Sequence, residues 1–215
     1  MKSLYLGNLL NKSFHIGIAG NIGAGKTTMA TKLADQFGWE KVYESVVDNP
    51  YLSDFYDNMD RWSFNLQVYF LYHRFSSQNK LDAIQTSFIQ DRTIYEDKEI
   101  FARNLRNQKL MSERDWKTYK SLFDSMIKFI NEPDLIIYLK ASTDTLLSRI
   151  ENRNRVFEKN IDPEYIHSLN IYYDQWIKKI EKNKKLIINT DNFNIFTDKE
   201  KYDNIVKQIQ NILMK

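Results

Sequence analysis

The segment Gly20-Asn21-Ile22-Gly23-Ala24-Gly25-Lys26-Thr27 constrains the fold of this chain more than any other. It matches the phosphate-loop pattern G-x-x-x-x-G-K-[ST] at every specified position, and the apolar run 14–19 comes directly before it. In such a loop the backbone N–H groups and the start of the following helix surround a phosphate. The lysine adds a cation and the hydroxyl can bind Mg²⁺. We therefore expect residues 20–27, together with Thr28, to bind the phosphates of a nucleotide.

Composition narrows the class of protein. A length of 215 residues suits one α/β domain with a single core. The absence of cysteine excludes disulfides and thiolate metal sites and fits a reducing cytoplasm, where we expect the protein. The net charge of +3 is mild, and the lysines at 178–179 and 182–185 are read as the solvated end of a helix rather than a nucleic-acid surface. No apolar stretch approaches the roughly 20 residues of a membrane span.

Apolar runs alternate with amphipathic segments along the chain, a pattern typical of a parallel sheet with helices on both faces. The sequence predicts five strands and at least six helices. The strands are placed at 14–20, 41–44, 87–91, 134–139 and 185–190. The helices are placed at 25–37, 62–79, 112–130, 143–153, 163–182 and 199–213.

Acidic residues stand at the carboxyl ends of two predicted strands, where an α/β sheet places its ligands. Glu44 ends the second strand, and Asp91 with Arg92 ends the third. Phosphoryl transfer to a hydroxyl needs a base and a metal-binding acid in that place. Each acid alone could instead be solvated or cap the next helix. Beside a phosphate loop, the pair favours a catalytic role.

Arg149, Arg153 and Arg155 lie where a predicted helix ends. Such a run is commonly an exposed helical face, but guanidinium groups also suit a segment that folds over the phosphates. The residues alone leave both readings open.

Taken in order, these motifs resemble the deoxynucleoside kinase family, whose members phosphorylate the 5′-hydroxyl of deoxynucleosides. The resemblance covers nearly the whole chain and rests on order and spacing. Besides the phosphate loop, it includes Glu44 with 48–52, Tyr56, 61–67, Arg74, 91–97, Phe101, 149–155 and Glu158. It implies one domain over 1–215 with the three-layer α/β/α fold of P-loop kinases, a five-stranded parallel sheet and an arginine-rich lid at about 149–160.

The resemblance also implies a role for each matching residue. ATP would be the phosphate donor and Mg²⁺ the metal, held by Thr27, Glu44 and Asp91. Glu44 or Asp91 would be the general base, and Arg92 would restrain Glu44. The catalytic set is therefore Glu44, Asp91, Arg92 and Lys26, while Arg149, Arg153 and Arg155 would hold the moving phosphate. The loop 189–193 would contact the base of the donor.

For the acceptor, Tyr56 and Glu158 resemble the residues that bind the sugar 3′-hydroxyl. Gln67 would pair with the base, Phe101 would stack on it and Trp62 would close the pocket side. Glu44 and Arg92 would also border the acceptor. Arg74 and Asp97 suit a base with an exocyclic amino group, which favours deoxyadenosine, with deoxycytidine and deoxyguanosine as further candidates. The family also implies a homodimer formed through helices 62–79 and 112–130.

Two other functions remain open from the sequence. A nucleoside monophosphate kinase of similar fold would need a cationic pocket for the acceptor's own phosphate. A nucleotide-binding switch would bind ATP without turning over an acceptor. The predicted acceptor residues, Tyr56, Gln67 and Glu158, favour the kinase that acts on an unphosphorylated deoxynucleoside.

Overall fold

The computed structural model describes residues 12–43, 49–155, 158 and 161–214. Its five strands form one sheet in the order β2-β3-β1-β4-β5, and every neighbouring pair is parallel. The strands are β1 (His15–Gly20), β2 (Glu40–Val42), β3 (Phe88–Asp91), β4 (Leu135–Lys140) and β5 (Lys185–Asn189). The predicted five-stranded parallel sheet is confirmed.

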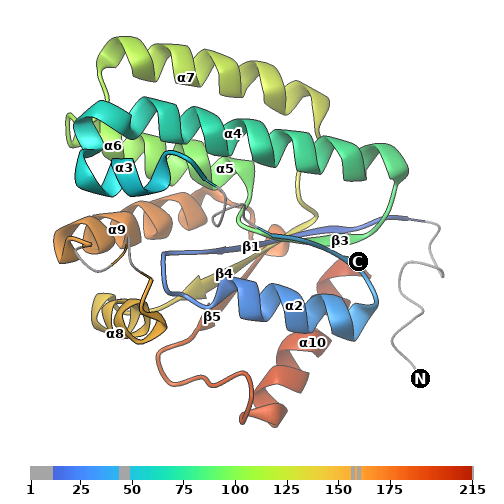
Figure 1. Cartoon of the computed structure of the whole chain (residues 1–215). Coiled ribbons are helices and arrows are strands. Elements are labelled where there is room, and N and C mark those ends of the chain that lie inside the picture. The colour runs from blue at the N-terminus through green and yellow to red at the C-terminus, as the bar shows by residue number, and fades with distance from the viewer. Residues whose placement is uncertain (1–11, 44–48, 156–157, 159–160, 215) are drawn as a thin grey trace.

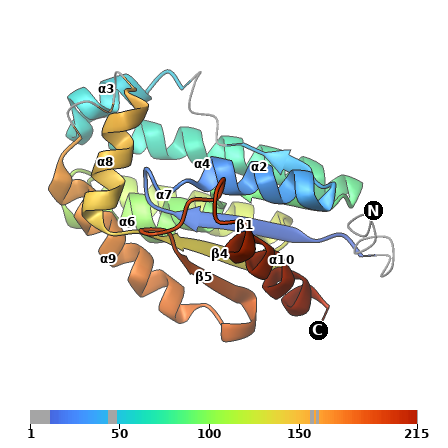
Figure 2. The same cartoon turned by 90° about the horizontal axis from the view of Figure 1, so that it is seen from below.

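The helices cover both faces of this sheet. In chain order they are α2 (Lys26–Phe37), α3 (Leu52–Asp57), α4 (Met59–Ile84), α5 (Ile94–Glu96), the π-helix η1 (Asp97–Ala102), α6 (Arg103–Asn107), α7 (Glu113–Met126), η2 (Ile127–Phe129), α8 (Thr143–Arg153), α9 (Pro163–Lys179), η4 (Lys182–Lys184) and α10 (Lys199–Leu213). Figure 1 shows α4, α6 and α7 above the sheet and α2 and α10 below it. Seen from below in Figure 2, α2 and α10 lie in front of the strands.

The central strands have no solvent-facing side. Every residue of β1 is buried, and so is every residue of β4 except Lys140. Continuous apolar strands of this kind need cover on both faces, which α4 and α2 provide from opposite sides. The three-layer architecture therefore follows from the composition of β1 and β4. None of the helices in the described part of the chain is long and apolar enough to cross a membrane.

Two helix boundaries differ from the prediction for local reasons. The long helix α4 begins at Met59 rather than residue 62, because the Asn58 side chain accepts a hydrogen bond from the Arg61 N–H and caps the helix there. Helix α9 ends at Lys179, and the Lys185 ammonium donates to the carbonyl oxygens of Ile177 and Ile180 near that end. Part of the lysine-rich segment thus stabilises a helix C-terminus.

The strand order places the two predicted functional segments side by side. β1 leads into the phosphate loop and β3 leads into Asp91 and Arg92, and in their parallel pairing Ile18 lies opposite Asp91. Because β1 and β3 are parallel, both segments leave the sheet at its carboxyl edge, and because adjacent strands are about 4.8 Å apart, they do so side by side.

Candidate active site

The phosphate loop connects β1 to α2, and its backbone conformation requires glycine. Gly23 has a φ of 84° and Gly25 a φ of 90°, which place both in the left-handed region. A Cβ atom on Gly23 would lie 2.9 Å from the Leu146 carbonyl oxygen, so space as well as conformation excludes a side chain there. Gly25 is the N-cap of α2, so the helix N-terminus faces the cavity beside the loop.

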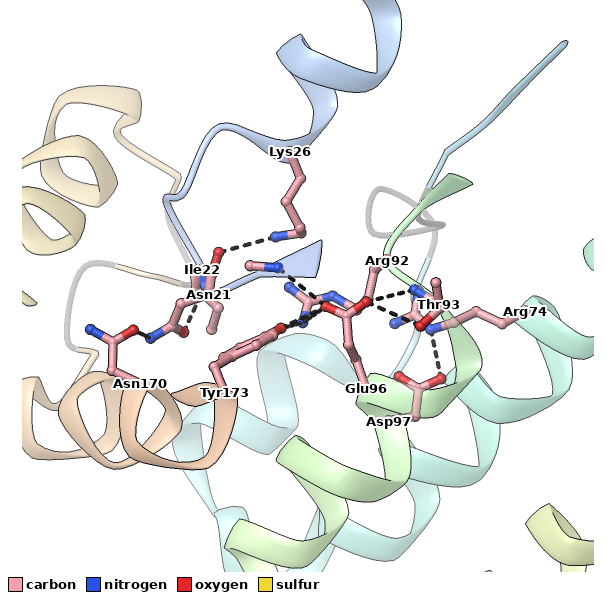
Figure 3. Close-up of polar contacts among 11 residues, drawn as sticks. Asn21, Ile22, Lys26, Arg74, Arg92, Thr93, Glu96, Asp97, Asn170 and Tyr173 are labelled. Atoms are coloured by element: carbon pink, nitrogen blue, oxygen red, sulfur yellow. Dashed lines mark hydrogen bonds and ion pairs between the residues drawn. The ribbon is translucent and has the colours of Figure 1, made fainter. Parts of the chain in front are cut away.

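Side chains of the loop are held from within and from α9. The Asn21 amide donates to the Ile166 carbonyl oxygen (2.9 Å) and to Asn170 Oδ1 (2.8 Å), and its own oxygen accepts from the Ile22 N–H. The buried Lys26 ammonium donates to the Asn21 carbonyl oxygen at 3.1 Å. Figure 3 shows the contacts of Asn21 with Asn170, Ile22 and Lys26. The loop is therefore shaped before any phosphate arrives.

Thr27, in the first turn of α2, and Asp91, the last residue of β3, are hydrogen-bonded to each other. The Thr27 hydroxyl donates to Asp91 Oδ2 at 2.5 Å, and Asp91 Oδ1 is buried without a hydrogen-bond partner in the described part of the chain. A hydroxyl beside a carboxylate with an uncommitted oxygen fits Mg²⁺, which binds few protein ligands and takes the rest from water and phosphate. Among the described residues no group of three or more acidic, His or Cys side chains could hold a metal by itself.

Arg92 lies at the centre of a buried polar network. Its φ of 68° is unusual for a residue with a side chain. Its guanidinium donates from Nη1 to the Tyr173 hydroxyl at 2.7 Å and lies over the Phe101 ring, 4.3 Å from the ring centroid. The Tyr173 hydroxyl in turn donates to Glu96 Oε1 at 2.8 Å. Burial raises the pKa of the Tyr173 phenol well above its usual value, although Arg92 acts in the opposite direction, so this hydroxyl keeps its proton.

A cavity of about 580 Å³ runs from the phosphate loop toward α4 and η1. This volume suits a small ligand. Its lining brings most of the predicted residues together: Ile22, Gly23, Gly25, Lys26, Thr27, Thr28, Tyr56, Gln67, Arg74, Asp91, Arg92, Asp97, Phe101, Arg149, Arg153, Arg155 and Glu158. Donor-side and acceptor-side candidates thus border the same space.

Where α4 and η1 line the cavity lies a buried ion pair. Arg74 Nε donates to Asp97 Oδ2 at 2.6 Å, and the two side chains are 6% and 1% exposed. Nearby on α4, the Gln67 amide oxygen is buried without a hydrogen-bond partner in the described structure. Buried polar groups of this kind normally have a hydrogen-bond partner, so the cavity presents a hydrogen-bond acceptor with which a ligand can pair.

The arginines at the end of α8 each have a partner. Arg149 donates to the Thr190 hydroxyl (3.1 Å) and carbonyl oxygen (2.5 Å), and Arg153 forms a bidentate pair with Glu158. Arg155 Nη1 lies 3.7 Å from the same carboxylate. Asn154 caps α8 with a φ of 48°, in the left-handed conformation that Asn tolerates better than most residues.

A second cavity of about 530 Å³ adjoins the first and shares Gly25, Thr28 and Arg149 with it. Its other walls come largely from the segment 190–196 after β5. Lys32 on α2 donates to the Ile195 carbonyl oxygen at 2.7 Å and lies over the Phe196 ring, which ties this segment to the helix after the phosphate loop.

Some predicted residues are not placed in the cavity. Glu44 and residues 156–157 and 159–160 of the predicted lid lie outside the described residues. Trp62 is not among the described residues that line the cavity. It packs on Tyr51 instead, with ring centroids 5.9 Å apart, and Arg61 lies over it.

Sequence patterns missed two groups of residues. Apolar and aromatic wall residues such as Phe55, Phe70 and Tyr165 carry no motif of their own. Glu96 lies within the matched run 91–97 but was given no role, and Tyr173 lies at a helical position that looks like an ordinary core position. The spacing of Thr93 and Glu96 is a capping-box pattern, and the structure forms that capping box.

The fold and the cavity define a P-loop phosphotransferase: the phosphate loop, the Thr27–Asp91 pair and the residues of α4 and η1 border one cavity. A family model described as deoxynucleoside kinase matches residues 16–214. This chain therefore belongs to the deoxynucleoside kinase family and is an ATP-dependent deoxynucleoside kinase.

Individual relatives agree with the family. The chain is 37% identical over 204 residues to a deoxyadenosine/deoxycytidine kinase of Bacillus subtilis, covering 94% of each chain. It is 33% identical over 210 residues to a deoxyguanosine kinase of the same organism, covering 95% of this chain and all of the relative. Its structure matches that of a deoxyadenosine kinase from M. mycoides with dCMP and dCDP bound. That match has a TM-score of 0.81 and 28% identity, and covers 91% of this chain and 100% of the other.

The membership settles the choice among the three functions open from the sequence. A monophosphate kinase and a non-catalytic switch are not supported, because the matched family and the relatives phosphorylate deoxynucleosides.

Proposed function

We propose that this enzyme acts mainly on deoxyadenosine, transferring the γ-phosphate of ATP to its 5′-hydroxyl, with deoxycytidine as second acceptor. The observation that carries the proposal is the buried Arg74–Asp97 pair beside the unpartnered Gln67 amide oxygen. A carboxylate accepts several hydrogen bonds, so Asp97 can accept from an exocyclic amino group in addition to Arg74. Adenine and cytosine both carry such a group next to a ring acceptor.

The sugar and base would lie between α4, η1 and the residues after α8. Tyr56 and Glu158 line the cavity where they can bind the 3′-hydroxyl, and Phe101 can stack on the base. Glu158 also pairs with Arg153 and lies near Arg155, so these ion pairs hold its carboxylate at the cavity wall. Trp62 would have to change its side-chain position to close the pocket.

At the reacting centre, Mg²⁺ would be held by Thr27 and Asp91, directly or through water, and would neutralise charge on the donor phosphates. Glu44, which follows β2, is proposed as the general base that accepts the 5′-hydroxyl proton. Lys26 would contact the transferred phosphate, and Arg92 would restrain Glu44.

Arg149, Arg153 and Arg155 are proposed to supply guanidinium groups to the transferring phosphate as an arginine-rich lid over about 149–160. All three border the same cavity as the phosphate loop, which supports the proposal. The second cavity, formed by 190–196 and continuous with the loop, is proposed to receive the donor base. The whole assembly would act as one kinase domain over 1–215.

The test is a comparison of kcat/KM for the four deoxynucleosides with ATP and Mg²⁺, because this ratio reports differential transition-state binding. We expect deoxyadenosine to give the highest value and deoxycytidine the next. A preference for deoxyguanosine or thymidine would refute the base assignment alone. No 5′-monophosphate from any of the four would refute the enzymatic function.

We also propose that two copies pair through α4 and α7. Large apolar side chains are exposed on these helices and just after α7: Tyr72, Leu122 and Phe129. Sedimentation analysis should give a dimer, and Phe129→Asp should shift it toward monomer. The protein is expected in the cytoplasm, where ATP is supplied.

A further inference from the structure

One buried carboxylate connects the donor side of the site to the acceptor side. Glu96 has no exposed surface. Its Oε2 accepts from the Thr93 N–H and hydroxyl, while its Oε1 accepts from the Gly20 N–H (3.3 Å) and from the Tyr173 hydroxyl (2.8 Å). Figure 3 shows this carboxylate between the phosphate loop, the turn after β3 and α9. It thus contacts the first residue of the phosphate loop and, through Tyr173, reaches Arg92.

The Tyr173 hydroxyl completes the connection. It accepts from Arg92 Nη1 at 2.7 Å and donates its proton to Glu96, while Arg92 and Glu96 themselves are 3.9 Å apart. Charge-assisted hydrogen bonds of this kind have defined directions, so they select one orientation of the guanidinium. Arg92 needs such support because its backbone has a left-handed conformation, which residues other than glycine seldom adopt.

Helix α9 contacts the phosphate loop one turn before Tyr173. Asn170 Oδ1 accepts from the Asn21 amide at 2.8 Å, and Asn170 Nδ2 donates to the Ala141 carbonyl oxygen at 3.1 Å. Residues three apart share a face of a helix. The face of α9 that carries Asn170 and Tyr173 therefore touches both the donor loop and, through Arg92, the acceptor cavity.

We propose that Tyr173 and Glu96 are positioning residues for phosphoryl transfer, holding the Arg92 guanidinium at a set place relative to the phosphate loop. The inference rests on the proposed function, since it assigns these residues to the geometry of the same reaction. The rate of in-line transfer is sensitive to small displacements of the reacting groups, so a misplaced Arg92 lowers the rate of the chemical step. Neither residue needs to touch substrate for this effect.

The test begins with Tyr173→Phe, which removes one hydroxyl and keeps the ring. We expect kcat to fall about tenfold or more while KM for ATP and for the deoxynucleoside changes less than about threefold, because the variant keeps the ring and its contact with Phe101. The matched control is Tyr138→Phe. Tyr138 is a buried tyrosine stacked on Tyr173 whose hydroxyl donates to Asp174, so its loss perturbs the same packing without touching Arg92. This control should keep kcat within about twofold.

A double-mutant cycle with Arg92→Lys separates positioning from general stability. If Tyr173 acts through Arg92, adding Tyr173→Phe to Arg92→Lys should lower the single-turnover rate by less than about twofold further. Additive effects would overturn the proposal, as would a Tyr173→Phe variant that behaves like Tyr138→Phe or loses substrate affinity instead of rate. A wild-type protein that forms no deoxynucleoside monophosphate would instead refute the proposed function, so the two failures are distinguishable.

Discussion

The buried pair between Arg74 and Asp97 allows stability and activity to be separated by mutation. Its two side chains are 2.6 Å apart and only 6% and 1% exposed, so the pair is almost completely buried. Asp97→Ala leaves the Arg74 charge buried without this partner, and breaking a buried pair in this way costs about 3–5 kcal/mol of unfolding free energy. Adding Arg74→Met removes the uncompensated charge and should restore at least about 2 kcal/mol of that loss.

Activity should not return with stability. Both the single and the double variant lack the proposed base-recognising carboxylate, and a hydrogen bond to a charged group is worth about 1.5–3 kcal/mol. We therefore expect kcat/KM for deoxyadenosine to fall about 100-fold in both, with the larger share in KM.

Urea unfolding curves and steady-state kinetics measure the two quantities on the same samples. Asp124→Ala is the control, because Asp124 pairs with Lys120 on the surface of α7 and such pairs contribute less than about 1 kcal/mol after solvent screening. The reasoning is refuted if the double variant is no more stable than Asp97→Ala, or if it regains activity on deoxyadenosine.

Three further predictions follow from single sites. Gly23→Ala should raise KM for ATP at least tenfold, because its φ of 84° and the nearby Leu146 carbonyl exclude a Cβ; an unchanged KM would contradict the loop geometry. Glu44→Gln should lower kcat by about 100-fold if Glu44 is the base, measured with saturating ATP and deoxyadenosine. Burial lowers the pKa of His15 from 6.5 to about 4, against the effect of its bond to Gln90. The unfolded state therefore binds the proton first as pH falls below 6.5, and unfolding free energy should drop by about 1.4 kcal/mol per pH unit down to pH 4. His15→Gln should remove that slope from denaturation curves.

The sheet could be predicted from the sequence because its central strands β1 and β4 are largely apolar runs. β1, β3 and β4 lie within about one residue of the predicted ranges. β2 is weaker: it spans only Glu40–Val42, where the prediction placed 41–44. An edge strand with exposed side chains has no strong apolar signal, so its limits depend on pairing with β3.

The segment after β3 was not predictable in detail. η1 is a π-helix over Asp97–Ala102, and nothing in its local residue pattern specifies the extra residue per turn. This segment carries Asp97, which contacts Arg74 on α4, and Phe101, which packs under Arg92. Such contacts between distant parts of the chain override local preference, which is why motif matching found these residues but not their geometry.

The candidate site, like the fold, could be predicted from the sequence only in part. The phosphate loop, Asp91 and Arg92 follow from spacing, because the chemistry is tied to strand ends. Glu96 and Tyr173 are 77 residues apart and each looks like a core residue of a helix, so only the folded chain reveals that they are hydrogen-bonded.

The pairing of Ile18 with Asp91 has a consequence for how such an enzyme can change its substrate. The spacing between the phosphate loop and Asp91 is set by backbone hydrogen bonds of the sheet, which side-chain substitutions barely alter. Gln67, Arg74 and Asp97, in contrast, lie on α4 and η1, outside the sheet. Acceptor choice can therefore be redesigned on those two helices while the machinery for activating the donor phosphate stays as it is, and a library confined to α4 and η1 is the economical place to begin.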